Sequence, residues 1–121
     1  MNAFFSTRAG CVVRWLDLPG DGVPLVFVHG LGCASSYEYP RVVCDPNFQG
    51  RRAILIDLPG YGYSEKPKEF SYSISEQARV VAELITHLQL NDYFLYGHSM
   101  GGSIAIEAAT QLDGLRGLIV S

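Results

Sequence analysis

The stretch Gly97–Gly102, with the sequence GHSMGG, constrains this chain more than any other. It follows a short apolar run, Tyr93–Tyr96, and precedes a segment, Ile104–Leu112, whose alanines and other apolar residues recur at helical spacing. This order predicts a strand, a sharp turn and a helix. A G-x-S-x-G match carries functional meaning only in that setting.

The serine at the apex of this turn, Ser99, is a candidate nucleophile because a sharp turn would project its hydroxyl above the end of the sheet. Side chains at Gly97 and Gly101 would clash across the turn, and glycine removes the clash. The Met100 amide, at the start of the helix, would point beside the hydroxyl and could stabilise an oxyanion. A glycine-rich turn with an incidental serine is the alternative.

A second glycine-rich turn follows a buried strand earlier in the chain. The continuous apolar run Leu25–Val28 is typical of a parallel strand, and it ends in His29, Gly30, Leu31 and Gly32. An oxyanion hole needs two amide donors, and a turn of this kind lets the backbone approach closely enough to supply the second. The hypothesis is that His29 braces this loop through hydrogen bonds.

A third turn follows the apolar run Ile54–Ile56 and covers Asp57–Ser64, with the sequence DLPGYGYS. Its glycines and proline indicate a structural turn. Taken in order, HGLG, DLPGYGYS and GHSMGG resemble the α/β-hydrolase superfamily, in its ester-hydrolase branch. The resemblance runs over nearly the whole chain, and it is specific for the superfamily but not for a substrate.

The resemblance implies an α/β fold: a partial α/β-hydrolase fold, with a mostly parallel sheet and an antiparallel N-terminal hairpin, truncated after about the sixth strand. It implies one incomplete core domain over residues 1–121. It also implies serine hydrolysis of an ester, thioester, lactone or amide carbonyl, with Ser99 as nucleophile and the amides of Leu31 and Met100 as the oxyanion hole. Gly97, His98, Gly101, His29 and Gly30 would support that site. The turn around Ser99, residues 97–101, corresponds to the nucleophile elbow of this superfamily. Dehalogenases and epoxide hydrolases of the superfamily place aspartate at the elbow.

The remaining pattern fits this fold. Residues 3–7 and 11–17 predict a hairpin, residues 18–22 a loop, and residues 115–120 a last buried strand. Ser73 and Glu76 predict a capping box before an amphipathic helix.

Residues 33–47 are irregular, with a short helix expected from Ser35, and their tyrosines are expected to pack or lie at the surface. Arg51 and Arg52 are expected at a solvated edge.

Composition excludes several classes of function. The net charge of −3 and the absence of a basic patch argue against nucleic acid as a partner. No apolar run reaches the ~20 residues needed to span a bilayer, and we see no signal peptide. Three cysteines at irregular spacing form neither a disulfide framework nor a metal site and favour a cytoplasmic setting. We expect a small acyl substrate and no metal or cofactor.

A serine nucleophile needs a histidine held by a carboxylate, and in this superfamily both follow the serine. No histidine follows Ser99, and the later acids, Glu107 and Asp113, lie too far along the chain to reach it. His98 is expected to pack or to form hydrogen bonds, and His87 to be a surface histidine. We therefore expect the acid and the base to lie beyond Ser121.

Two other hypotheses remain open. One is a non-catalytic relative that binds a ligand or associates with a partner. The other is a truncated product without a function of its own. A downstream reading frame that holds an acidic residue and a late histidine would favour the enzyme.

Overall fold

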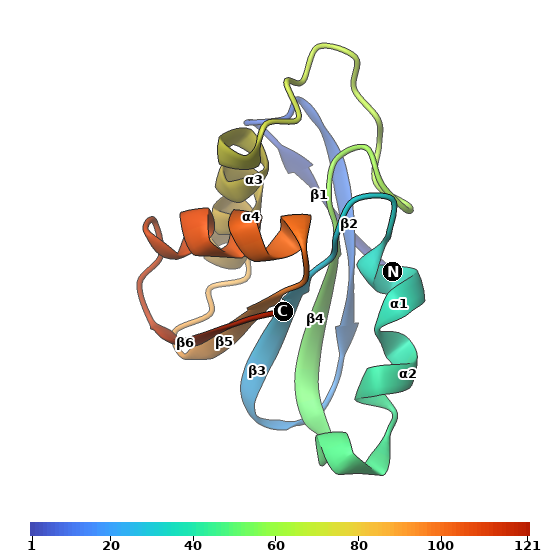
Figure 1. The fold of residues 1–121 in the computed structure, drawn as a ribbon, viewed down its shortest axis with the longest axis vertical. Helices are drawn as coiled ribbons and strands as arrows, with labels where there is room; N and C mark the ends of the chain where they lie inside the picture. Colours follow the sequence, from blue (N-terminus) through green and yellow to red (C-terminus); the bar gives the residue numbers. More distant parts are fainter.

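The computed structural model describes all residues, 1–121, and contains one six-stranded sheet (Figure 1). Four strands are mutually parallel, whereas the first two pair antiparallel with their neighbours. The strands in sheet order are β1 (Asn2–Ser6), β2 (Cys11–Leu18), β4 (Arg51–Asp57), β3 (Asp21–Val28), β5 (Tyr93–Gly97) and β6 (Leu115–Val120). The antiparallel N-terminal hairpin and the mostly parallel sheet are confirmed.

Helices cover both faces of the sheet (Figure 1). Alternate side chains of β3 show the two layers: Val26 and Val28 pack into the large core, and Phe27 packs into the small one. The long helices α3 (Ile74–His87) and α4 (Met100–Ala109) cover the large core. The opposite face carries the short helices α1 (Ser35–Glu38), α2 (Pro40–Val43) and the 3₁₀ turn η1 (Pro46–Phe48).

Helix α3 begins as its sequence predicts. The Ser73 hydroxyl accepts a hydrogen bond of 3.1 Å from the Glu76 amide, which satisfies one free donor of the first turn. The Glu76 carboxylate does not close the capping box, because it binds Arg79 at 3.0 Å instead. The cap is therefore a serine cap with an added ion pair.

Three predictions about local structure were wrong. The last strand, β6, is present but not buried, because each of its residues is partly or fully exposed. Residues 18–22 are not a continuous loop, because β3 starts at Asp21, which pairs with Arg51, and only residues 19 and 20 separate it from β2. The arginine pair is not at a solvated edge, because β4 lies inside the sheet. Arg52 makes a bidentate contact with Asp17, and the Arg51 guanidinium lies 5.5 Å from the Phe94 ring centre.

The short helices agree better with expectation. The expected helix at Ser35 is α1, although two further short turns follow it. Tyr39 packs on Phe27 with ring centres 4.7 Å apart, and burial raises the pKa of Tyr39 to about 12. Tyr37 is exposed. None of the helices has the length and apolarity needed to cross a bilayer.

Candidate functional site

The turn at Ser99 joins the end of β5 to the start of α4. Ser99 has φ 55° and ψ −121°, a backbone conformation that a residue with a side chain rarely adopts. Two hydrogen bonds of 2.8 Å close the turn, from the Gly101 amide to the His98 carbonyl and from the Gly102 amide to the Ser99 carbonyl. The sharp turn that GHSMGG predicts is therefore present, and Ser99 is exposed at its apex.

Both flanking glycines are required by close backbone contacts. A Cβ on Gly97 would overlap the backbone of Gly101 and stand 2.8 Å from the Gly102 Cα. A Cβ on Gly101 would overlap the carboxyl end of β3, at the carbonyls of Val28 and His29. Gly97 therefore closes the turn on itself, whereas Gly101 allows the start of α4 to rest on the neighbouring strand.

The loop after β3 lies directly beside this turn. A Cβ on Gly30 would stand 3.4 Å from the Ser99 Cβ and 3.2 Å from the His98 carbonyl oxygen. The two loops meet because β3 and β5 are parallel neighbours, so their carboxyl ends share one edge of the sheet. Their following helices leave to opposite faces, an arrangement that opens a crevice for ligands in α/β sheets.

Neither the Leu31 amide nor the Met100 amide donates a hydrogen bond within the chain. Leu31 is 72% exposed and lies in the loop at this edge of the sheet. Leu31 thus lies in the loop after β3, and Met100 follows Ser99 as the first residue of α4, so the two predicted donors belong to adjacent segments at this edge of the sheet.

His29 is fully buried below the loop. The Leu58 amide donates to its Nε2 at 3.1 Å, so this nitrogen is an acceptor and carries no proton. The proton is then on Nδ1, which donates to the Gly30 carbonyl at 2.8 Å. Burial lowers the pKa of His29 and favours this neutral form. His29 therefore ties the loop after β3 to the turn after β4.

Asp57 ends β4 at the same edge of the sheet, but none of its hydrogen-bond partners belongs to the Ser99 turn. Its buried carboxylate accepts hydrogen bonds from the Ser36 amide at 3.0 Å, the Ser36 hydroxyl at 2.7 Å and the Tyr63 amide at 3.0 Å. These contacts fix the start of α1 and the turn after β4, which supports the structural interpretation of residues 57–64.

No histidine ring of this chain has the Ser99 hydroxyl as a hydrogen-bond partner. His29 uses both ring nitrogens elsewhere. His87 lies on α3 and stacks on Phe4 with ring centres 5.1 Å apart. His98 is exposed, and its Nδ1 lies 3.0 Å from the Ser121 hydroxyl.

Sequence reasoning missed Ser121 and Tyr96. The Ser121 hydroxyl lies 3.0 Å from both the Tyr96 hydroxyl and His98 Nδ1. The only available signal was the parallel pairing expected between the strand of Tyr96 and the last strand, which places Ser121 level with the elbow.

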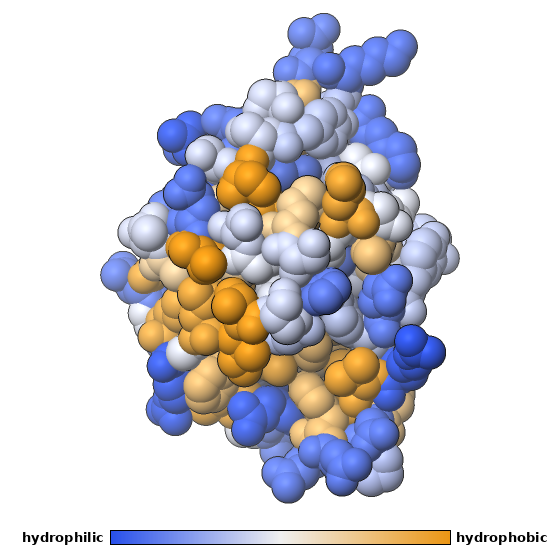
Figure 2. Space-filling view, viewed as in Figure 1, coloured by the Kyte–Doolittle hydropathy of each residue, from blue (hydrophilic) through white to orange (hydrophobic).

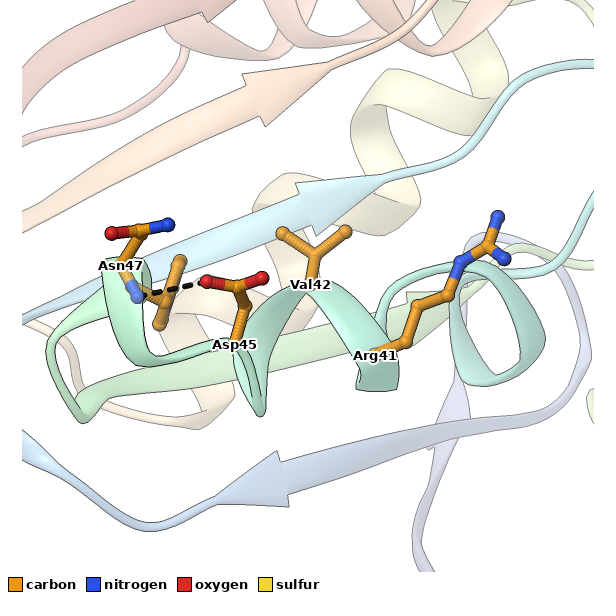
Figure 3. A pocket seen from close by; sticks show the side chains of 5 residues that line it. Arg41, Val42, Asp45 and Asn47 are labelled. Carbon is orange, nitrogen blue, oxygen red and sulfur yellow. Dashed lines mark hydrogen bonds between the residues drawn. The ribbon is translucent and has the colours of Figure 1, made fainter.

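One surface pocket lies away from the Ser99 turn (Figure 3). Its volume is about 700 Å³, and Arg41, Val42, Asp45, Asn47 and Phe48 line it. The Asp45 side chain accepts from the Asn47 amide at 2.8 Å, so this carboxylate caps η1. The cavity contains no candidate site residue. No group of three or more His, Cys, Asp or Glu side chains is placed to hold a metal ion.

The sequence model for the alpha/beta hydrolase fold matches residues 23–115. The chain therefore belongs to the alpha/beta hydrolase fold family. The match begins in β3 and ends at the start of β6, so it includes both loops that meet at Ser99.

Among curated relatives, the uncharacterized hydrolase YugF of Bacillus subtilis is 39% identical over 88 residues, which cover 72% of this chain and 31% of YugF. Haloalkane dehalogenase 2 of Mycobacterium bovis is 33% identical over 117 residues, covering 88% of this chain and 40% of the relative. Across five such curated relatives, the chain spans between 26% and 40% of the length of the relative.

Solved structures agree on the fold. A structure of the N-acyl homoserine lactonase AidH, complexed with N-hexanoyl homoserine lactone, superposes with a TM-score of 0.83 at 27% identity. It covers 98% of this chain, whereas this chain covers 44% of AidH. The six strands therefore correspond to part of a larger hydrolase fold.

Proposed function

We propose that this chain carries the nucleophile and the oxyanion hole of a serine hydrolase that acts through an acyl-enzyme. One observation carries the proposal: Ser99 is held at φ 55° on a tight turn, and the neighbouring loop lies so close that a Cβ on Gly30 would stand 3.4 Å from the Ser99 Cβ. Strained backbone of this kind persists only where the surrounding structure enforces it, and it clusters at active sites.

In the proposed reaction, the Ser99 Oγ attacks the carbonyl carbon of the substrate and gives up its proton to a base. The carbonyl oxygen becomes an oxyanion, which the amides of Leu31 and Met100 stabilise as donors. Collapse of the intermediate releases the alcohol, thiol or amine, which takes up the proton, and leaves an ester on Ser99. Water then attacks the carbonyl carbon of this ester and gives its proton to the same base. The acid is released, and the Ser99 Oγ takes the proton back.

The substrate class follows from the residue at the elbow. The relatives differ in chemistry, since one of them is a haloalkane dehalogenase and one structural neighbour is a lactonase. A serine supports acyl transfer, because its ester with an acyl group is readily hydrolysed, whereas superfamily members that displace halide or open epoxides use aspartate. We therefore propose a small ester, thioester, lactone or amide as substrate.

The base is the part that this stretch does not provide, since none of its three histidine rings has the Ser99 hydroxyl as a hydrogen-bond partner. We propose that the histidine and its carboxylate belong to sequence after residue 121 in the full-length protein. If that sequence holds neither, the non-catalytic hypothesis is favoured. All three cysteines are free, which supports a reducing, cytoplasmic setting.

The test compares the full-length protein with its Ser99→Ala variant in p-nitrophenyl acetate hydrolysis. We expect turnover to fall to the weak residual level that an oxyanion hole alone supports, ~10³ to 10⁴-fold over water. Ser103→Ala is the matched control, because Ser103 is an exposed serine one turn into α4 whose hydroxyl makes no hydrogen bond. Equal activity of wild type and Ser99→Ala would refute the proposal.

A further inference from the structure

We infer that Ser121 is a positioning residue for the Ser99 turn, acting through a hydroxyl bridge between β5 and the residue before the nucleophile. The inference rests on the proposed function. It concerns a residue that no motif contains and that lies just past the end of β6, next to the elbow.

The backbone of Ser121 brackets the turn on both sides. The Ser121 amide donates to the Gly97 carbonyl at 3.1 Å, and the Ser99 amide donates to the Ser121 carbonyl at 2.9 Å. These bonds extend the parallel ladder of β5 and β6 by one step, up to the residue with positive φ. The strained residue is thus hydrogen-bonded through its amide to Ser121.

The side chain of Ser121 adds a second connection. Its Oγ lies 3.0 Å from the Tyr96 hydroxyl and 3.0 Å from His98 Nδ1. A serine hydroxyl can donate one hydrogen bond and accept others, so it can link both partners at once. When His98 Nδ1 carries no proton, Ser121 donates to it and accepts from Tyr96. When Nδ1 is protonated, His98 donates to the Ser121 oxygen, which can either donate to the Tyr96 hydroxyl or accept from it.

The Tyr96 end of the bridge is held in place by ring packing. The Tyr96 ring packs against Phe27 at 5.4 Å and against Tyr39 at 5.8 Å between ring centres. Phe27 is a buried residue of β3, the strand that leads into the loop containing Leu31. The bridge therefore links packed side chains of the sheet to His98, the neighbour of Ser99, and limits how far the turn can shift.

The experiment uses the full-length protein and three variants. Ser121→Ala removes the bridge, Ser121→Thr keeps the hydroxyl, and Ser103→Ala is the control for an exposed serine near the turn. Two readouts are compared: kcat and KM for p-nitrophenyl acetate, and the ¹⁵N shifts of the His98 ring nitrogens in histidine-labelled protein. The NMR readout does not depend on activity.

We expect Ser121→Ala to lower kcat about fivefold, the effect of losing one ordinary hydrogen bond, with KM within about twofold. The His98 Nδ1 shift should move in Ser121→Ala and stay near wild type in Ser121→Thr and Ser103→Ala. Either a normal kcat or an unchanged Nδ1 shift in Ser121→Ala would overturn the inference. Failure of the proposed function would show separately, as wild-type turnover in Ser99→Ala.

Discussion

Gly101 rests directly against His29: a methyl group on the Gly101 Cα would stand 2.8 Å from the carbonyl carbon of His29. The elbow and the loop after β3 are therefore in contact through backbone alone, with no side chain between them. This contact sets the spacing between the two amides that we propose as oxyanion donors.

The first prediction concerns the glycines of α4. Gly101→Ala should cost about 1–3 kcal/mol of stability, because the methyl group overlaps backbone that cannot move aside, and it should lower kcat of the full-length protein. Gly102→Ala is the matched control, since its Cβ would meet nothing closer than 3.4 Å. Alanine there should be neutral or stabilising by up to about 1 kcal/mol. Urea unfolding measures both, and equal effects would contradict the contact.

The second prediction concerns His29 and pH. Burial lowers the pKa of His29, so the folded protein keeps it neutral while the unfolded chain binds a proton below pH ~6.5. The unfolded state then holds more protons, so this contribution to stability is complete above pH ~6.5 and is lost as pH falls toward the folded pKa.

The variant His29→Phe tests this account. It should lower stability at pH 7.5 by about 2–4 kcal/mol, because the Leu58 amide and the Gly30 carbonyl lose their partners. It should also flatten the decline in urea midpoint between pH 7.5 and 5.5. His87→Phe, which changes an exposed histidine, should leave that decline unchanged. Equal pH slopes in wild type and His29→Phe would contradict the role of His29.

The third prediction separates structure from catalysis at Asp57. Asp57→Ala should cost about 3 kcal/mol, because a buried carboxylate with three hydrogen bonds is removed. Asp57→Asn should also lower stability, because its NH2 group would face one of the backbone N–H donors from which the carboxylate accepts, and its kcat should stay near wild type while the protein is folded. Asp45→Ala, at the exposed cap of η1, is the stability control. A large loss of kcat in folded Asp57→Asn would contradict the purely structural role of Asp57.

The fourth prediction concerns residues 1–121 expressed alone. Apolar side chains gather at the surface over β6 and α4, where Ile106, Ile119 and Val120 are about half exposed (Figure 2). The outer edge of β6 pairs with no strand of these residues. We expect association in light scattering and no Ser99-dependent hydrolysis of p-nitrophenyl acetate. A monodisperse monomer that turns over substrate would contradict both expectations.

The sequence predicted the parts of the fold that depend on local pattern. The elbow at Ser99, the antiparallel hairpin and the cap at Ser73 each follow from residue types at fixed spacing. It did not predict the partners of Arg51 and Arg52, because their contacts come from strands that are distant in the chain. The secondary-structure propensity of a residue does not determine which residue of a distant strand it contacts.

In the candidate site, too, some residues could be assigned from local motifs and others only from the tertiary structure. His29 and the glycines could be assigned from motifs, because their roles depend on backbone close to them in sequence. Ser121 could not, because its hydrogen bonds require the register between β5 and β6. The tautomer of His29 also depended on Leu58, which lies 29 residues away.

Covalent labelling tests the central claim most directly. The full-length protein is treated with a fluorophosphonate, digested and mapped by mass spectrometry, with Ser99→Ala and heat-unfolded protein as controls. The account predicts one adduct, on Ser99 of the folded wild-type protein, and none in either control. An adduct on another serine, or no adduct on a protein that hydrolyses p-nitrophenyl acetate, would contradict it.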